Sequence, residues 1–146
     1  MKQWMAVLVF GLFSLGPVAQ AAESGTLEVT FTGLQPGKGE LVVALFRNGE
    51  HWLEGELAYR RQALAITGES QTLRFADLPF ADYGLYAFHD ENGNRKFDMR
   101  WFPWPKPAEG AGVSNNALRN GPPRYPDARF RFDRDGMRLN IAIKYY

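Results

Sequence analysis

The chain has 146 residues, and its 17 Lys and Arg side chains nearly balance 16 Asp and Glu side chains, for a formal net charge of +1. This balance lacks the basic surplus that is typical of nucleic-acid-binding domains. Because the chain contains no cysteine, disulfides, thiolate metal sites and cysteine nucleophiles are excluded.

The first 21 residues have the pattern of a signal peptide. Lys2 supplies positive charge, residues 5–15 form an apolar run, and Ala19-Gln20-Ala21 is a small-x-small cleavage site. The apolar run is shorter than the roughly 20 residues that a membrane-spanning helix needs. We therefore expect cleavage after Ala21 or Ala22, one mature domain over residues 22–146, no membrane span after cleavage, and a periplasmic or secreted location.

The first part of the mature chain predicts strands separated by turns. Residues 26–32 alternate apolar and polar side chains, which indicates a half-buried strand. Residues 40–47 are apolar on both faces and predict a central strand. Residues 51–55 fit a helical turn or a loop, whereas residues 57–66 fit a helix or, as we favour, a strand.

The middle of the chain predicts two more strands with a turn between them. Residues 71–75 form a short alternating run, and residues 76–82 surround Pro79 and predict a turn. Residues 83–89 predict a strong strand whose odd-numbered side chains share one face.

The C-terminal part predicts a hairpin. Residues 128–132 and 137–145 have strand patterns, and Asp-Gly within residues 133–136 favours a tight turn because both residue types tolerate positive φ. The total is about seven strands without a long amphipathic helix. This pattern indicates an all-β fold, which we expect to be a β-sandwich, with a small barrel as the alternative.

The sequence HDENGNRKFD at residues 89–98 is the strongest candidate for a functional loop. Oxygen-bearing groups stand at alternate positions along it. Calcium prefers about six to eight hard oxygen ligands, so this spacing predicts a calcium site. Its candidate ligands are Asp90, Asn92, Asn94, the carbonyl of Lys96, Asp98 and, from a later segment, Glu109.

Two positions depart from the calcium-loop pattern. Arg95 stands where such loops need Gly for a sharp turn, and Trp101 stands where they have a bidentate Glu. Glu91 and Glu109 are the candidates for the missing carboxylate, and we expect a weak site with a Kd of about 10⁻⁴–10⁻³ M. The alternative is a metal-free turn, because Asp, Asn and Gly readily hydrogen-bond their own backbone. Phe97 occupies the position from which such loops insert an apolar side chain into the core.

The chain has two histidines, His51 and His89, and nothing flanks them at zinc-site spacing. We expect His89 to anchor the loop by hydrogen bonding, and we keep it as a candidate recognition residue.

The rings of Trp101, Phe102 and Trp104 are spaced by prolines and form a second candidate site. If exposed, they would make a stiff apolar ridge for sugar stacking or protein contact. The alternative is that these rings cap an open end of the sandwich, because large rings are mostly buried in folded proteins.

The carboxylates Asp90, Asp98 and Glu109 could also pair for glycoside hydrolysis. A mature chain of this length offers little room for the long cleft that such hydrolases need. We therefore expect a protein that is not an enzyme.

These motifs together resemble a bacterial family known as domain of unknown function 2141. The most specific match is the HDENGN run at residues 89–94, followed by Lys96 and Asp98. Looser matches extend over most of the mature chain, at residues 39–46, 75–78, 86–87, 109–110, 112, 114–116, 121–123 and 127–128. The resemblance implies one exported domain with an immunoglobulin- or prealbumin-like sandwich and no established activity.

We therefore expect an exported, non-catalytic β-sandwich domain of the cell envelope, whose loop at residues 89–98 binds calcium or forms a rigid recognition surface. A carbohydrate- or protein-binding module that uses Trp101, Phe102 and Trp104 is the second hypothesis, and a small hydrolase is the third. The expected partner is an envelope protein or carbohydrate, and no nucleic acid.

Overall fold

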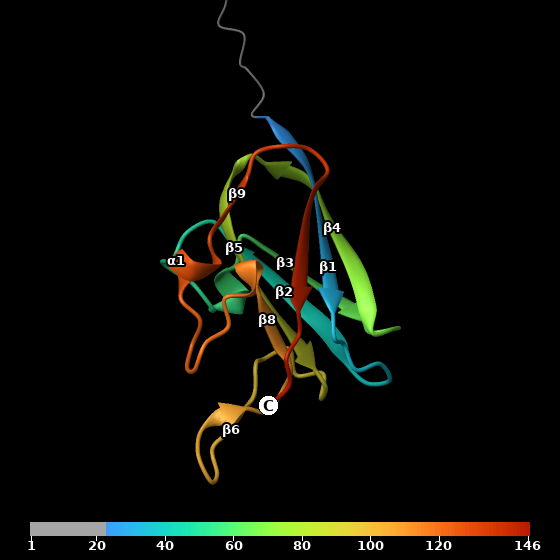
Figure 1. Ribbon diagram of the computed structural model, residues 1–146, viewed down its shortest axis with the longest axis vertical. Coiled ribbons are helices and arrows are strands. Elements are labelled where there is room, and N and C mark those ends of the chain that lie inside the picture. The colour runs from blue at the N-terminus through green and yellow to red at the C-terminus, as the bar shows by residue number, and fades with distance from the viewer. Residues whose placement is uncertain (1–22) are drawn as a thin grey trace, which may run out of the picture.

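The computed structural model describes residues 23–146, so the predicted signal peptide and cleavage site lie outside the described residues. Strands dominate this part of the chain (Figure 1). The strands are β1 (Ser24–Thr32), β2 (Glu40–Phe46), β3 (Arg60–Ala65), β4 (Ser70–Pro79), β5 (Ala81–Asp90), β6 (Met99–Arg100), β7 (Lys106–Pro107), β8 (Ala111–Val113), β9 (Phe130–Phe132) and β10 (Met137–Ala142). The helical elements are the 3-10 turns η1 (Gly55–Leu57) and η2 (Ser114–Asn116) and the single turn α1 (Tyr125–Ala128).

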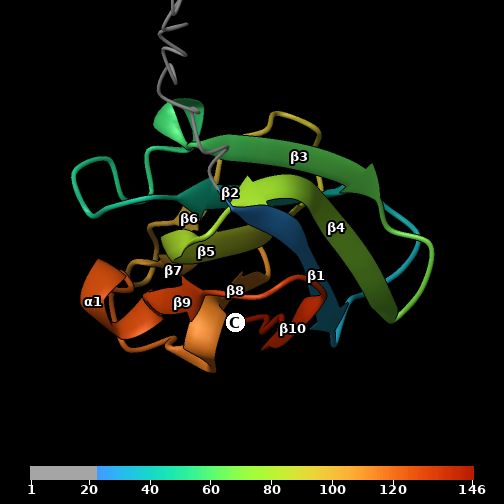
Figure 2. The same cartoon turned by 90° about the horizontal axis from the view of Figure 1, so that it is seen from above.

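Two sheets pack face to face, which confirms the all-β sandwich (Figure 2). One sheet has the order β10-β1-β4, with β1 parallel to β10 and antiparallel to β4. The other has the order β3-β2-β5-β8, and β9 pairs with the first residues of β5. The predicted strands at residues 26–32, 40–47, 57–66 and 83–89 correspond to β1, β2, β3 and β5.

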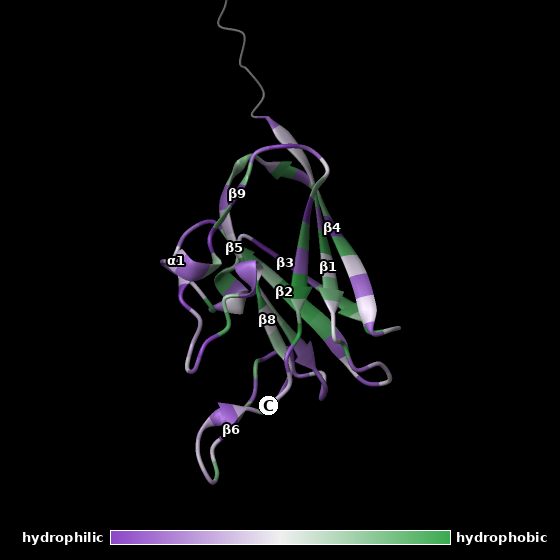
Figure 3. Ribbon diagram, viewed as in Figure 1, coloured by the Kyte–Doolittle hydropathy of each residue, from purple (hydrophilic) through white to green (hydrophobic). Residues whose placement is uncertain are grey.

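The core between the sheets is built by alternate residues of the facing strands. β1 contributes Leu27, Val29 and Phe31, each fully buried, and β5 contributes its odd-numbered side chains from Tyr83 to Ala87. Figure 3 shows the resulting alternation of apolar and polar residues clearly along β4. The alternation of apolar and polar residues in the sequence therefore predicts correctly which side chains face the core.

A second apolar layer covers the outer face of the larger sheet. Val42, Ala44 and Phe46 of β2 and Tyr86 and Phe88 of β5 form it, and loop side chains pack over them. β2 is therefore buried on both faces, as its continuous apolar run predicts. This layer also forms one wall of the cavity described below.

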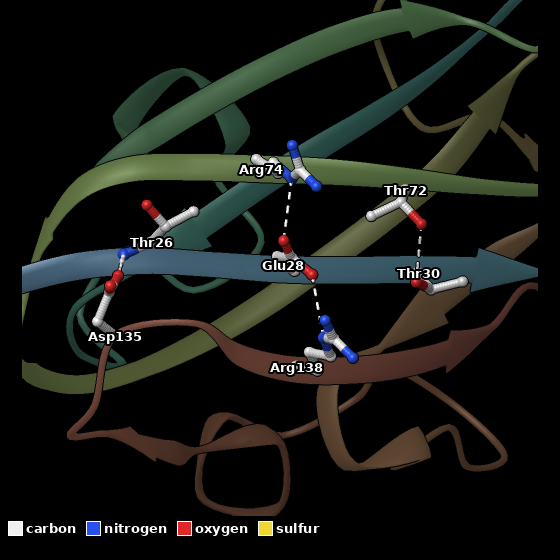
Figure 4. Close-up of polar contacts among 7 residues, drawn as sticks. All are labelled: Thr26, Glu28, Thr30, Thr72, Arg74, Asp135 and Arg138. Atoms are coloured by element: carbon white, nitrogen blue, oxygen red, sulfur yellow. Dashed lines mark hydrogen bonds and ion pairs between the residues drawn. The ribbon is translucent and has the colours of Figure 1, made fainter.

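The outer face of the smaller sheet is polar. Glu28 at the centre of β1 pairs with Arg74 of β4 at 3.0 Å and with Arg138 of β10 at 3.1 Å (Figure 4). The hydroxyls of Thr30 and Thr72 lie 2.9 Å apart on the same face. Exposed pairs of this kind contribute little stability each, but they join three strands in one register.

The predicted turn over residues 76–82 is wrong. β4 continues to Pro79, and Phe80 alone separates it from β5. The reason is long-range pairing, because Leu78 and Pro79 oppose Gly25 and Ser24 at the start of β1. Between Gly25 and Leu27 the register shifts, because β4 has one residue more than β1 between their partners Leu78 and Phe75.

The predicted C-terminal hairpin is also wrong. β9 pairs with β5 in one sheet, whereas β10 pairs with β1 in the other, so residues 133–136 cross between the sheets. The Asp-Gly turn is present, since Gly136 has φ +69° and Asp135 accepts a 2.7 Å hydrogen bond from the Thr26 N–H (Figure 4). The strand begins at Phe130 because α1 occupies the preceding residues.

Candidate functional site

The loop after β5 winds around the carboxylate of Asp90. This residue is fully buried at the last position of the strand. One of its oxygens accepts the Gly93 N–H at 2.8 Å, and the other accepts the Arg95 N–H at 2.7 Å. Gly93 and Arg95 both have positive φ, so the chain turns sharply enough to point both amides at one carboxylate.

The side chains of the two asparagines form further hydrogen bonds within the loop. The side-chain oxygen of Asn92 accepts the Asn94 N–H at 3.0 Å, and that of Asn94 accepts the Lys96 N–H at 2.8 Å. Both amide NH₂ groups donate to Oδ2 of Asp98, at 2.6 and 2.9 Å. Side-chain oxygens of the loop therefore accept the backbone N–H groups of residues 93–96.

Glu109 fastens both ends of this loop to the segment before β8. Its side chain is buried, and its two oxygens accept the Glu91 N–H at 3.3 Å and the Asp98 N–H at 3.1 Å. Burial raises the pKa of Glu109 above its ordinary value, and the two backbone N–H groups partly oppose that rise. We call the hydrogen-bonded assembly of Asp90, Asn92, Asn94, Asp98 and Glu109 the acidic-loop network.

The side chains among the predicted calcium ligands thus lie together, and their oxygens accept N–H donors. Among residues 23–146, no three His, Asp or Glu side chains converge as a group that could hold a metal ion. A carboxylate oxygen has a second lone pair, so these hydrogen bonds do not by themselves decide whether an ion binds. The calcium hypothesis stays a prediction.

His89 lies inside the molecule, where it anchors the loop. It is 2% exposed, and its Nε2 lies 2.7 Å from the Lys38 carbonyl, which can only accept, so Nε2 carries the proton. Its Nδ1 lies 2.8 Å from the Tyr145 hydroxyl, which also accepts the Gln35 N–H. The ring therefore ties together three segments distant in sequence and is not at the surface.

A short hairpin, β6–β7, follows the acidic-loop network directly. Met99 pairs with Pro107 and Arg100 with Lys106, and the Ala108 N–H donates to the Asp98 carbonyl at 3.0 Å. Figure 1 shows this segment standing out from the body of the sandwich. Asp98 of the network directly precedes the hairpin, so the two features that the sequence singles out are one continuous structure.

The three rings at the hairpin tip point into solvent. Trp101 is 72% exposed, Phe102 is 84% exposed and Trp104 is 68% exposed. Of the two alternatives for these rings, the structure therefore shows the exposed ridge and not the cap on the sandwich. Phe97, which precedes Trp101 by four residues, packs inward. Its ring centroid lies 5.7 Å from that of Tyr86 and 5.8 Å from that of Phe88.

An apolar cavity of about 500 Å³ lies between the hairpin base and the outer face of the larger sheet. Tyr86 and Phe97 line it, together with Lys106 of β7 and residues 118–123 of the loop before α1. Sequence reasoning missed this cavity, because its walls come from separate segments that only the fold brings together. The one local signal is the Gly121-Pro122-Pro123 run, which cannot join a central strand.

Comparison with known proteins gives one match. The family model described as "Uncharacterized protein conserved in bacteria (DUF2141)" matches residues 29–140, which is more than half of the chain. No curated protein and no solved structure matches. Residues 23–146 contain no helix with the length and apolar composition that crossing a membrane requires.

Proposed function

This chain belongs to the bacterial DUF2141 family, and we propose that it acts as an exported, non-catalytic recognition domain whose β6–β7 hairpin contacts a partner in the cell envelope. The observation that carries the proposal is the exposure of Trp101, Phe102 and Trp104 at the hairpin tip. Exposed clusters of large apolar side chains mark interaction sites, because water around them is released on contact. The signal-peptide pattern over residues 1–21 supports the location in the envelope.

The acidic-loop network supports the proposal by holding the hairpin base. Glu109 follows the hairpin in the chain, and its side chain accepts the N–H groups of Glu91 and Asp98, which both precede the hairpin. The Ala108 N–H, which follows the hairpin, donates to the backbone carbonyl of Asp98, which precedes it. A contact surface that is fixed before binding loses less conformational entropy when it binds. In this role the loop is a rigid support, and calcium binding by the same loop is the alternative role.

A non-catalytic role fits the state of the carboxylates. Asp90 is fully buried and Glu109 is 4% exposed, and all four of their oxygens accept backbone N–H groups. A general acid or base must reach a substrate proton, directly or through one water. The hydrolase hypothesis, which pairs these side chains with Asp98, would require Asp90 or Glu109 to become accessible to a substrate.

Of the two partner classes, we favour a protein over a carbohydrate. A projecting hairpin buries its rings best by entering a groove, and a folded protein offers one. Residues 99–107 carry Arg100 and Lys106 and no carboxylate, so a groove with an acidic rim is the complementary surface.

The test is retention by an envelope fraction of the producing bacterium. Wild-type protein, produced with its complete sequence, is incubated with the fraction, sedimented and quantified across a concentration series. We expect saturable retention that is weakened more than about 10-fold in Trp101→Ala/Trp104→Ala, because loss of an aromatic anchor typically costs about 2 kcal/mol or more. Treating the fraction with protease beforehand should remove the retention.

Leu57→Ala is the matched control, because Leu57 is 54% exposed and lies outside the hairpin. Circular dichroism and thermal melts of both variants check that the fold is intact. Equal retention of wild type and Trp101→Ala/Trp104→Ala would refute the hairpin as the contact surface. Retention that survives protease and is competed by soluble glycan would refute a protein partner.

A further inference from the structure

We propose that the cavity beneath the hairpin binds a small amphipathic anion, with an apolar chain inside and a carboxylate at the mouth. This inference goes beyond the recognition role of the hairpin, since it concerns the cavity and not the rings at the hairpin tip, and a different kind of ligand. The cavity volume of about 500 Å³ lies within the range of about 300–1,000 Å³ that small-molecule sites occupy.

The lining of the cavity suits an apolar chain. Its wall consists mainly of aliphatic, aromatic and proline side chains from the second apolar layer and the hairpin base. They include Leu53, Phe97, Met99, Ala111 and Leu118. Transfer of an alkyl chain from water to such a wall is favourable by about 0.8 kcal/mol per buried CH₂ group.

A hydroxyl without a partner supplies one polar contact. Tyr86 lines the cavity and is 7% exposed, and its hydroxyl forms no hydrogen bond with any group in residues 23–146. In that part of the chain every fully enclosed side-chain oxygen or nitrogen has a partner, so this hydroxyl is not fully enclosed, and the cavity is one of the two hollows that Tyr86 lines. Burial keeps it protonated by raising its pKa, and it can donate to a ligand oxygen.

The charges in the lining select an anion. Lys106 and Arg119 are the charged side chains among the lining residues, and no Asp or Glu of residues 23–146 joins them there. Neither cation lies within ion-pair distance of a carboxylate in the described part of the chain. The carboxylate that acts on Tyr86 is that of Glu109, whose oxygens are held by backbone N–H groups. A ligand carboxylate would give these cations a counter-charge.

The test compares two probes with the same alkyl chain and head groups of opposite charge. Dodecanoate and dodecylammonium are titrated below their micellar concentrations into the full-sequence protein by calorimetry. We expect saturable 1:1 binding of dodecanoate that is about 10-fold or more tighter than that of dodecylammonium, which corresponds to about 1.4 kcal/mol. Non-saturable dodecanoate binding, or equal affinity for the two charged probes, would overturn the proposal.

Variants locate the site. Arg119→Glu should weaken dodecanoate binding about 10-fold, whereas the same change at Arg134, another exposed arginine, in the turn before β10, should leave the affinity unchanged. Tyr86→Phe should weaken it several-fold, and Leu118→Trp should abolish binding by filling the cavity. If Leu118→Trp fails to fold, the two arginine variants still decide the question, because equal effects at both positions would overturn the proposed site.

The hairpin variant separates this inference from the proposed function. Trp101 and Trp104 do not line the cavity, so Trp101→Ala/Trp104→Ala should bind dodecanoate like wild type. Failure of dodecanoate binding therefore leaves the hairpin proposal intact, and failure of envelope retention leaves the cavity proposal intact.

Discussion

At the scale of single residues, Glu109 shows how one side chain can define the shape of a site. It accepts the backbone N–H groups of Glu91 and Asp98, which lie at opposite ends of the loop. The sequence identifies Glu109 as an oxygen donor near the loop, and its actual partners are amide protons. An Asp, Asn or Glu side chain satisfies a cation or an N–H with the same atoms, so the residue type alone cannot distinguish the two uses.

Glu109 gives a pH-dependent prediction. Its pKa in the folded protein lies above the ordinary value of 4.5, chiefly because of burial. The folded state therefore holds the proton more tightly than the unfolded state, and this contribution to stability is lost as pH rises from 4.5 through the raised pKa. The free energy of unfolding of wild type minus that of Glu109→Gln should therefore fall across this interval and then level off.

Urea unfolding of wild type and Glu109→Gln at a series of pH values between about 4 and 8 measures this difference. Glu69→Gln, at an exposed position, controls for the removal of one carboxylate. A wild-type advantage that grows with pH would contradict the assigned direction of the pKa change.

At the scale of elements, the acidic loop depends on a glycine from another segment. Gly39 has φ +68°, and a Cβ placed there would lie 1.9 Å from the Asp90 carbonyl oxygen, which is a backbone atom that cannot move aside easily. We expect Gly39→Ala to destabilise the fold by about 3 kcal/mol or more, because it combines a positive φ with a backbone clash. Gly68→Ala, where the nearest atom is 3.7 Å away, should cost less than about 1 kcal/mol.

The comparison of Gly39→Ala with Gly68→Ala is made from urea midpoints at neutral pH. If both variants unfold at the wild-type midpoint, the close approach of Gly39 to the end of β5 is not a constraint on the loop.

The loop also gives a prediction for calcium. If the loop serves as the rigid support that we propose, 10 mM calcium should leave the melting temperature within about 1 °C of its value in chelator. A ligand at 100 times its Kd would add about 2.7 kcal/mol, which is a rise of several degrees for a domain of this size. Such a rise, specific to calcium and absent from Asp90→Ala/Asp98→Ala, would establish the loop as an ion site.

The local pattern of apolar residues was sufficient to predict those strands whose position is decided by which side chains are buried. The two-faced apolar run of β2 and the alternation of β1 and β5 predict their positions within a residue or two. It was insufficient where distant pairing decides the structure. Residues 76–79 became strand because β1 was there to pair with them, and residues 133–136 cross between sheets because β10 adds to β1 in parallel.

At the scale of the whole molecule, the sandwich carries an extra layer on one face. The outer face of the larger sheet is covered by loops that include Trp52, Phe97 and Tyr125, and the cavity lies within this cover. The opposite outer face is a polar surface joined by Glu28 and its two arginines. The hairpin, the acidic-loop network and the cavity therefore gather around one edge of the covered face. The hairpin follows the network directly in the chain, but the cavity also needs Leu53 and Tyr86 from earlier segments, so its position could not be read from spacing.

The measurement that tests the central claim most directly is site-specific photo-crosslinking in living cells. A photoreactive residue replaces Phe102 at the hairpin tip in one strain and Thr72 on the polar outer face in another. We predict a discrete protein adduct from position 102 that disappears in the Trp101→Ala/Trp104→Ala background, and no such adduct from position 72. An absent adduct at position 102, or the same adduct from both positions, would contradict the hairpin as the recognition surface.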